Sequence, residues 1–537
     1  MTTAVPGASP ALVPFDRESR SYQQRWWILL VLCMSLLVII VDNTILNVAV
    51  PTIVTQLDAS TSQLQWMVDS YTLVFAGLLL TAGSLGDRFG RRGALQVGMV
   101  IFGLGSLLAA TSDSAGDLIL YRGVMGVGGA FIMPATLSII TNVFPPEERG
   151  KAIGLWAAVA GVAGVVGPTT GGFLLEHFYW GSIFLVNIPI VIVALAAGFF
   201  LIPTSRDPSK PALDPLGALL SIVGLVSFVY AIIQAPEEGW TSPMTLGVFA
   251  FSIIVLAGFA LWERTVASPM LDTSFWRDPR FSAASGGIAL IFFAMFGSIF
   301  LLTQYFQFVM GYSAFEAGVR LLPWALTMLI VAPNSARLAH KYGTKVVVGS
   351  GLSIAAFSLA LLATLPGEGS SYWGDVVWRM VPLAFGMALT MAPATESIMG
   401  SLPRAKAGVG SAVNDTTRQI GGAFGVAIIG SVMASVYGSR VADSLAGLGV
   451  EGEPADVAKE GLGQALRVAQ EAPGSLGPQI ASVARDAFME GMHRGVLVGS
   501  IGALIGALVV FKWLPARAAD ALEQRGEEVP VPAEGEQ

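Results

Sequence analysis

The chain has 537 residues, of which 54% are hydrophobic and only 12% are charged, and its formal net charge is −7. Soluble domains carry roughly 25% charged residues, so this chain lacks the charge needed to cover a water-exposed surface. Apolar runs such as 26–49 and 183–203 are long enough to cross about 30 Å of hydrocarbon. The composition therefore predicts an all-α polytopic membrane protein.

Several other classes of protein are excluded by what the sequence lacks. The single cysteine, Cys33, rules out an intramolecular disulfide. The three histidines are scattered, and none begins a zincin motif, so no metal site is expected. The chain has no phosphate-binding G-x-x-x-x-G-K-[ST] loop, no recognisable nucleophile, and an acidic charge balance that disfavours nucleic acid. We therefore expect neither an enzyme with catalytic residues nor an ATP-driven machine.

Apolar windows between charged or Pro/Gly-rich breaks predict fourteen membrane-spanning helices. In chain order these cover residues 26–50, 64–85, 94–112, 118–143, 152–175, 183–203, 214–235, 244–263, 282–309, 316–338, 346–365, 377–400, 408–437 and 494–514. Lys and Arg fall in alternate connections, and such basic loops stay on the cytoplasmic side. We therefore expect a multi-pass protein of the cytoplasmic (inner) membrane with both termini in the cytoplasm.

The long segment 438–493 breaks this charge pattern, but long loops cross the membrane regardless of their charge. It contains amphipathic stretches in which Leu462, Ala465, Leu466 and Ala469 follow a helical spacing. The pattern predicts a small extracellular helical element on the outer rim of the bundle. A mobile loop is the alternative.

Three short segments recur in the same order. GSLGDRFGRR (83–92) aligns with ARLAHKYGTK (336–345), MPAT (133–136) with APAT (392–395), and RGKA (149–152) with RAKA (404–407). Each pair is shifted by eight predicted helices rather than six, which places two extra helices between two six-helix halves. Duplicated halves with a site between them near the midplane are typical of secondary transporters.

The predicted organisation is therefore 6+2+6. It consists of a cytoplasmic N-terminal segment (1–25), an N-terminal bundle (26–203), two inserted linker helices (214–263), a C-terminal bundle (282–514) that includes the loop 438–493, and a cytoplasmic tail (515–537).

Several motifs resemble those of one known family. GSLGDRFGRRGAL after the second helix resembles the cytoplasmic signature of the major facilitator superfamily, and LILYRGVMGVGGA resembles its helix-4 motif. GVVGPTTGG resembles its helix-5 antiporter motif. VDNTILNVAVP, IFLVNIPI and VGSAVNDTTRQIGGAFGVA resemble the fourteen-helix drug:proton antiporter branch. The resemblance covers roughly residues 26–515 and implies the major facilitator fold.

The same resemblance implies a function: proton-coupled export of hydrophobic, often cationic, compounds, with the proton as coupling ion and no other cofactor. The expected partners are the lipid bilayer, small substrates and protons, with no nucleic acid, and the protein is expected to work as a monomer. Dedicated export of one metabolite, lipid or siderophore is an alternative within the same class. A nutrient–proton importer and, in a different class, a transporter-like sensor or scaffold are further alternatives.

Charged residues inside membrane spans are costly and mark candidate functional sites. Asp42, Asp69 and Arg122 all fall in the outer halves of their predicted helices. A carboxylate in a low dielectric tends toward neutrality, and a nearby arginine restores its charge. Such a pair is suited to exchanging a proton for a cationic substrate, although a permanent ion pair locking helices is the alternative.

Glu396 follows the repeated APAT segment near the inner end of the twelfth predicted helix. It is a candidate proton or cation site, or alternatively an interfacial carboxylate paired with Arg404 or Arg418. We therefore place Glu396 with Asp42, Asp69 and Arg122 among the candidate coupling residues.

The loop signature between the second and third helices is the candidate cytoplasmic gate. The resemblance implies that Asp87 docks at the start of the helix beginning near Gly408, where a carboxylate is favoured by the helix dipole. The second copy has His340 at the position of Asp87, and a purely topogenic basic turn is the alternative. The gate residues are Gly83, Gly86, Asp87, Arg88, Gly90, Arg91 and Arg92.

Two further sets complete the candidate site. The glycines and proline of the fifth helix allow close approach and bending; they are Gly164, Gly167, Pro168, Gly171 and Gly172. Aromatic and polar side chains near the expected cavity could hold flat cations against ring faces; they are Trp66, Tyr71, Tyr305, Phe306, Trp324, Asn414 and Arg418.

Overall fold

The computed structural model describes residues 17–57, 60–209 and 212–516. Most of the expected N-terminal segment 1–25, namely residues 1–16, lies outside the described residues. Nearly all of the expected tail 515–537 does so as well, because the description ends at residue 516.

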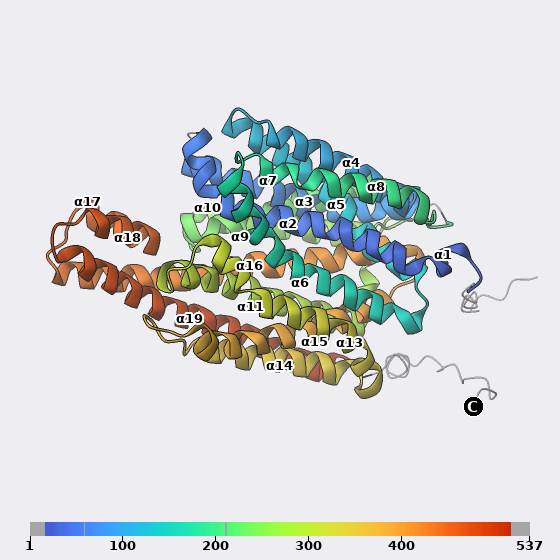
Figure 1. Cartoon of the computed structure of the whole chain (residues 1–537). Helices are drawn as coiled ribbons and strands as arrows, with labels where there is room; N and C mark the ends of the chain where they lie inside the picture. Colours follow the sequence, from blue (N-terminus) through green and yellow to red (C-terminus); the bar gives the residue numbers. More distant parts are fainter. Residues whose placement is uncertain (1–16, 58–59, 210–211, 517–537) are drawn as a thin grey trace, which may run out of the picture.

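All regular structure within the described residues is helical (Figure 1). The helices are α1 (Arg20–Gln23), α2 (Arg25–Leu57), α3 (Thr61–Phe89), α4 (Arg91–Ala110), α5 (Ala115–Val143), α6 (Pro146–His177), α7 (Ser182–Leu185), α8 (Asn187–Leu201), α9 (Pro215–Glu238), α10 (Pro243–Trp262), η1 (Thr273–Arg277), α11 (Pro279–Gln304), η2 (Tyr305–Val309), α12 (Ala314–Val319), α13 (Leu322–Tyr342), α14 (Thr344–Leu362), η3 (Tyr372–Val377), α15 (Trp378–Gly400), η4 (Arg404–Lys406), α16 (Ala407–Gly447), α17 (Glu453–Glu460), α18 (Leu462–Glu471) and α19 (Leu476–Trp513).

Fourteen segments of the described chain are long and apolar enough to cross a membrane, as the sequence predicts. Several predicted spans consist of two pieces. The sixth is α7 followed by α8, the ninth ends in the π-helical turn η2, and the tenth is α12 followed by α13. These breaks lie within or beside apolar sequence, which explains why hydropathy alone did not locate them.

Local sequence signals account for where the helices begin and end. Ser60 and Gln63 form a capping box at the start of α3. Gly90 separates α3 from α4 with φ of 122°, and Gly343 separates α13 from α14 with φ of 89°. Only glycine adopts such backbone angles without strain. The two copies of the repeated loop therefore turn in the same way.

The contacts between helices divide most of the spans into two groups, and we call the remaining pair, α9 and α10, the linker helices. In the first group α5 packs on α3 and α4, and α6 packs on α2; in the second, α11, α16 and α19 pack together and α14 packs on α15 and α19. The helices α9 and α10 pack on each other, and α9 also contacts α3 and α16. The two groups meet where α6 contacts α13 and α15, and where α16 contacts α3 and α5.

The segment 438–493 is helical for most of its length. The last spans are longer than hydropathy predicts, because α16 runs to Gly447 and α19 begins at Leu476. Between them, α17 and α18 project at one end of the bundle (Figure 1). The hydroxyl of Tyr437 donates to the Ala458 carbonyl at 3.0 Å, which holds α17 against α16.

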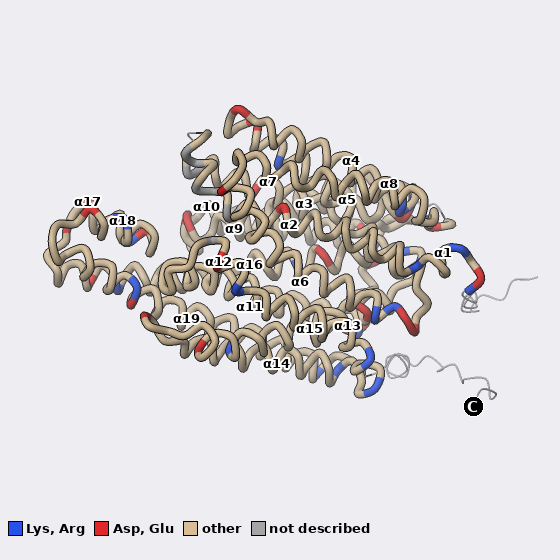
Figure 2. The backbone as a smooth tube through the Cα atoms, viewed as in Figure 1, with Lys and Arg blue, Asp and Glu red and all other residues tan. Residues whose placement is uncertain are grey.

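Charged side chains are unevenly placed along the bundle (Figure 2). Lys and Arg gather at the end that carries α1, which we call the basic end; the α3–α4 turn at Gly90 and the α13–α14 turn at Gly343 hold Arg88, Arg91, Arg92, Lys341 and Lys345. The opposite end carries α17 and α18. The long apolar stretches between the two ends carry few charges, so the charged residues found there require an explanation.

Candidate functional site

A buried ion pair lies in the core of the first helix group. The guanidinium of Arg122, on α5, donates through Nη1 to Asp42 Oδ2, on α2. Both side chains are completely buried, with 0% of each exposed. A buried pair of this kind is costly to break, because removing one partner leaves an uncompensated charge. Asp42 and Arg122, which the sequence singled out separately, are therefore direct partners.

Neighbouring helices hold both members of this pair in place. The Asn187 side chain of α8 donates to Asp42 Oδ1 at 3.1 Å, and the Nε of Arg122 donates to the Met67 carbonyl of α3 at 3.1 Å. The guanidinium also lies over the ring of Tyr71, 4.5 Å from its centroid. The Nη2 of Arg122 remains buried without a hydrogen-bond partner. Four spans thus converge on one pair, with one strong donor left unused.

Asp69 and Trp66 lie outside this network, although the sequence placed them in the candidate site. The charge that acts on the Asp69 carboxylate is that of Glu237 on the linker helix α9. Trp66 is 40% exposed and stacks on Tyr230 of the same linker helix, with ring centroids 6.3 Å apart. Both residues therefore belong to the contact between α3 and the linker.

A second buried carboxylate, Asp415, was missed in the sequence. It lies on α16 next to Asn414, and only 1% of its side chain is exposed. Its Oδ1 is 3.7 Å from Arg418 Nη1 and accepts a hydrogen bond from Asn414 Nδ2 at 3.3 Å. Its Oδ2 accepts a hydrogen bond from Ser411 at 3.4 Å. An acidic residue within an apolar span was the available signal, and it was the criterion that identified Asp42.

Arg418 connects this second carboxylate to the other helix group. Its Nη2 donates to the Thr395 hydroxyl of α15 at 2.9 Å. Its guanidinium lies 4.8 Å from the ring centroid of Trp156, which belongs to α6 in the first group. The Nε of Arg418 is buried and has no hydrogen-bond partner. Arg418 and Asn414 are thus brought together, on the interface between the groups.

Glu396 lies nearer the basic end of the same interface. Its carboxylate is 3.8 Å from His340 Nε2, and Gly150 of α6 packs directly against it. Arg418, one of the two arginine partners considered from the sequence, pairs with Asp415 instead. His340 occupies the position that Asp87 has in the first repeat. The second loop copy thus supplies a partner for the half-buried Glu396 carboxylate rather than a carboxylate of its own.

Asp87 connects the two helix groups at the basic end. Its carboxylate accepts the backbone N–H groups of Gly408 at 2.9 Å and Val409 at 3.1 Å, in the first turn of α16. It also accepts Arg91 Nε at 2.8 Å, and Arg91 Nη2 donates to the carbonyls of Arg404 at 2.7 Å and Ala405 at 2.9 Å. A carboxylate at a helix N-terminus is stabilised by the helix dipole. These contacts join α3 and α4 to the start of α16 at the basic end.

The other residues of the loop signature surround this contact. Gly83 allows α3 to approach Gly408 of α16 closely, because a Cβ there would meet the Gly408 carbonyl at 2.6 Å. The guanidinium of Arg88 lies 5.3 Å from the Phe89 ring centroid. That of Arg92 lies 4.8 Å from the Phe199 ring centroid. Gly86 and Gly90 lie at the end of α3, where the chain turns.

The glycine-rich motif of α6 contacts helices of both groups. Gly167 packs against Thr44 and Gly171 against Ile45, both on α2. Gly172 packs against Phe315 of α12, whereas a Cβ at Gly164 would meet nothing within 4 Å. Pro168 lies inside the helix, and Gly318, near the end of α12, approaches it. The motif therefore provides close packing on two sides.

Three of the aromatic candidates lie in the second helix group and are buried. Tyr305 donates to the Pro366 carbonyl at 3.1 Å, and its ring centroid lies 6.2 Å from that of Phe306. Trp324, on α13, is 5% exposed. Tyr305 and Phe306 form the π-helical turn η2. These side chains are part of the hydrophobic core of the described residues.

Comparison with known proteins supports one family. Residues 32–426 match the family model of the Major Facilitator Superfamily. The chain is 34% identical over 493 residues to the multidrug efflux pump LfrA of Mycolicibacterium smegmatis, covering 92% of this chain and 97% of that protein. It is 32% identical over 513 residues to the tetracenomycin C resistance and export protein of Streptomyces glaucescens, covering 95% of this chain and 94% of that protein.

A solved structure has the same fold. The crystal structure of the human organic anion transporter MFSD10 covers 93% of this chain and all of that one, with a TM-score of 0.59 and 15% identity. At this identity the likeness concerns the fold alone. The family match extends over most of the chain, and the two relatives align over nearly their whole length. This multi-pass membrane protein belongs to the major facilitator superfamily of transporters.

Proposed function

We propose that the protein exports hydrophobic, often cationic, compounds across the cytoplasmic membrane in exchange for protons. The observation that carries the proposal is the Asp42–Arg122 pair, a carboxylate and a guanidinium with no exposed surface, held by four spans of one helix group. A buried carboxylate needs either a positive partner or a proton. Arg122 supplies the first, and the coupling proton supplies the second.

Because Asp42 needs either Arg122 or a proton as its partner, transport can proceed by exchanging one for the other. When the helices move and Arg122 withdraws, or when a cationic substrate takes its place, Asp42 exchanges its neutralising partner. Breaking a buried pair without compensation costs about 3–5 kcal/mol, so the proton must arrive as the partner leaves. The unused Nη2 donor of Arg122 gives the guanidinium a free hydrogen-bonding position during this movement.

The basic end is proposed to face the cytoplasm, with both termini there. Lys and Arg gather at this end (Figure 2), and such clustering is typical of the cytoplasmic side. The Asp87 contact with α16 then serves as the cytoplasmic gate, and Glu396 with His340 lies on the path behind it. We propose that a single chain suffices, since the pairs Asp42–Arg122 and Asp415–Arg418 are both formed within it.

The energy available fits such a pump. One charge moved through about 100 mV supplies roughly 2.3 kcal/mol, which sustains a concentration ratio of about fifty. The name of LfrA, a multidrug efflux pump, supports export of several compounds.

The test is transport in proteoliposomes of the purified full chain, with ethidium as the fluorescent lipophilic cation. We expect ethidium to move against its gradient when a pH gradient of the correct sign is imposed, and to stop moving when a protonophore is added. Liposomes carrying the Asp42→Asn variant are the matched control. Ethidium transport at the same rate with and without the pH gradient would refute proton coupling.

A second candidate is dedicated export of one compound. It is favoured by the relative from Streptomyces glaucescens, whose name specifies resistance to and export of tetracenomycin C. Competition distinguishes the two candidates. A multidrug pump transports ethidium and loses that transport in the presence of several unrelated lipophilic cations, whereas a dedicated exporter of another compound does not transport ethidium at all.

A further inference from the structure

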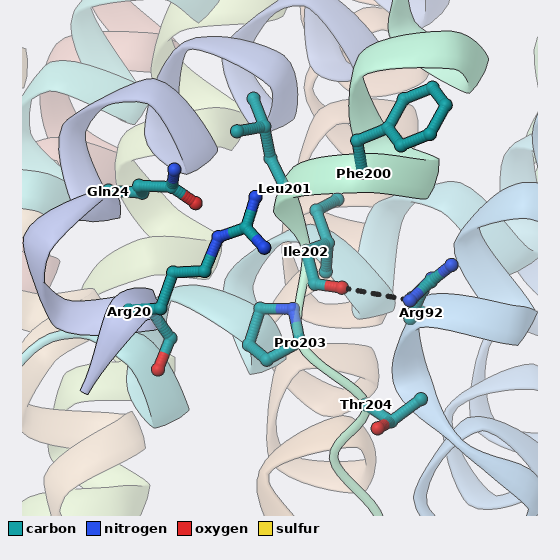
Figure 3. Close-up of a pocket in the computed structure, with 9 residues that line it drawn as sticks. Arg20, Gln24, Arg92, Phe200, Leu201, Ile202, Pro203 and Thr204 are labelled. Carbon is teal, nitrogen blue, oxygen red and sulfur yellow. Dashed lines mark hydrogen bonds between the residues drawn. The ribbon is translucent and has the colours of Figure 1, made fainter.

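A cavity of about 340 Å³ lies where three segments meet at the basic end (Figure 3). Arg20 comes from α1, Arg92 from the first turn of α4, and Phe200 from the end of α8. The Arg20 guanidinium points into the space beside Gln24, and Arg92 lies on the other side of the Ile202 backbone (Figure 3). The cavity thus has a positively charged side and an apolar side.

The two arginines of this cavity are not neutralised. Among the described residues, neither Arg20 nor Arg92 forms an ion pair, and Arg92 donates only to the Ile202 carbonyl, at 3.4 Å. Nearby Arg25 is different, because its Nε lies 2.6 Å from Glu148 Oε2. No acidic side chain lines the cavity. Two guanidinium groups with free N–H donors around one space attract an anion with several acceptor oxygens.

The apolar side of the cavity indicates where that anion comes from. Phe200 is 74% exposed and Phe199 is 57% exposed, at the end of the membrane span α8. Trp27, near the start of the adjacent span α2, is 64% exposed. Large exposed rings at the end of a span face lipid at the level of the headgroups. A ligand here therefore has its charge among the arginines and its hydrocarbon against the rings.

We propose that this cavity binds the phosphate group of an anionic phospholipid from the adjacent leaflet. Arg20 and Arg92 hold the phosphodiester oxygens, while Phe199 and Phe200 contact the acyl chains. Anionic headgroups of the cytoplasmic leaflet attract Lys and Arg near the membrane surface. The assignment to that leaflet rests on the proposed orientation, whereas the phosphate site itself does not.

A bound lipid at this place also touches the segment that leads to the gate. Pro203 and Thr204 line the cavity. The next residue, Ser205, accepts the backbone N–H of Arg91 at 3.0 Å, and the Asp207 N–H donates to the Asp87 carbonyl at 2.6 Å. A phosphate that ties α1 to α4 therefore stabilises the backbone beside the Asp87 contact.

The experiment measures binding of palmitoyl-oleoyl phosphatidylglycerol to the purified full chain by native mass spectrometry. The Arg20→Gln/Arg92→Gln variant is compared with Lys341→Gln/Lys345→Gln, which removes two charges from the same end of the other helix group. Lys345 is the repeat equivalent of Arg92. The single Arg20→Gln variant is a second probe, because Arg20 is exposed and its loss cannot disturb the core.

We expect binding to weaken about fivefold for each arginine removed, thus about 25-fold for the double variant. The lysine variant is expected to bind like the wild type. Phosphatidylcholine, which has no net charge, is expected to bind weakly to the wild type and to all three variants. Equal losses of phosphatidylglycerol binding in the arginine and lysine variants, or no loss in either, would contradict the proposed lipid site.

Inorganic phosphate separates the two sources of the anion. We expect it to leave bound phosphatidylglycerol in place at equal concentration, because it lacks the acyl chains that contact the rings. Displacement at equal concentration would show a site for free phosphate and overturn the lipid assignment. Since lipid binding is measured without transport, an inactive pump that still binds the lipid refutes only the proposed function.

Discussion

Two of the three buried carboxylate–arginine pairs in the described part of the chain differ in how they are built. Asp42 and Arg122 come from separate helices of one group, make direct contact, and are held by a third helix through Asn187. Asp415 and Arg418 are three residues apart on one helix, and their closest charged atoms are 3.7 Å apart. The first pair ties a helix group together. In the second pair the charged groups are farther apart, and the Arg418 guanidinium contacts Trp156 of the other group.

This difference suggests a division of labour. A pair enclosed within one group is protected from water and suits a site where a proton replaces a positive partner. An arginine that lies over Trp156 of the opposite group changes its surroundings whenever the groups move relative to each other. We infer that Asp42 of the first pair carries the coupling proton, and that the contacts of Arg418 in the second pair change when the two groups move relative to each other.

The largest effect is expected for Asp42→Asn. Proton-driven export should fall to the level of empty liposomes. The free energy of unfolding should drop by about 3–5 kcal/mol, because Arg122 is left buried without its partner. The apolar span α2 should still insert. Thermal unfolding in detergent and proteoliposome transport provide the two measurements.

The double variant Asp42→Asn/Arg122→Gln separates stability from coupling. It should regain much of the lost stability, since no buried charge remains unpaired, while export stays absent. Recovery of proton-driven export in the double variant would contradict the role of the pair. Asp69→Asn is the matched control, because Asp69 faces the linker helix α9 and should affect export far less.

For Asp415→Asn we expect a smaller loss of stability, about 1.5–3 kcal/mol, as for hydrogen bonds to a charged group. The Arg418 guanidinium keeps its hydrogen bond to Thr395 in this variant. Export should slow but remain driven by the pH gradient. A loss of coupling as complete as that of Asp42→Asn would remove the distinction between the two pairs.

The contact between groups at the basic end gives the next prediction. Asp87→Asn should cost about 1 kcal/mol or more at the start of α16, which shifts the population toward the open state about fivefold. Cysteines placed along the path behind Asp87 should then be labelled faster by a water-soluble maleimide. His340→Gln is the control in the second repeat. Equal labelling in wild type and Asp87→Asn would return the loop to a purely topogenic role.

The smallest expected effect concerns the linker helices. Glu263, directly after α10, is 3% exposed and accepts the Leu271 N–H at 3.0 Å. Burial, with the nearby charge of Asp214, raises the pKa of Glu263 to about 7. The folded state therefore holds a proton that the unfolded chain releases above about pH 4.5, and this contribution to stability is lost as the pH rises toward 7.

The Glu263→Gln variant should remove that contribution to the pH dependence. Its unfolding temperature should fall less than that of the wild type between pH 5.5 and 7.5. The exposed Glu238→Gln on the same linker is the control and should follow the wild type. A pH dependence in Glu263→Gln that matches the wild type would contradict the raised pKa.

The fourteen spans were predictable from the sequence because a helix needs an apolar run of about twenty residues to cross the bilayer. The extensions of α16 and α19 were not predictable in this way, since helical residues outside the hydrocarbon need not be apolar. Asp42 and Arg122 were visible as charges in apolar helices, but their pairing depends on how α2 and α5 pack. The partnership of Glu396 with His340 likewise arises only from tertiary contact.

The most direct test of the central claim is proton release on substrate binding. Purified protein in weakly buffered detergent solution is mixed with a saturating lipophilic cation, and the pH change is recorded. If substrate binds the state in which Arg122 has withdrawn and Asp42 is protonated, and displaces that proton, the wild type should release protons, Asp42→Asn should release none, and Asp415→Asn should still release them. Undiminished proton release from Asp42→Asn would contradict the account.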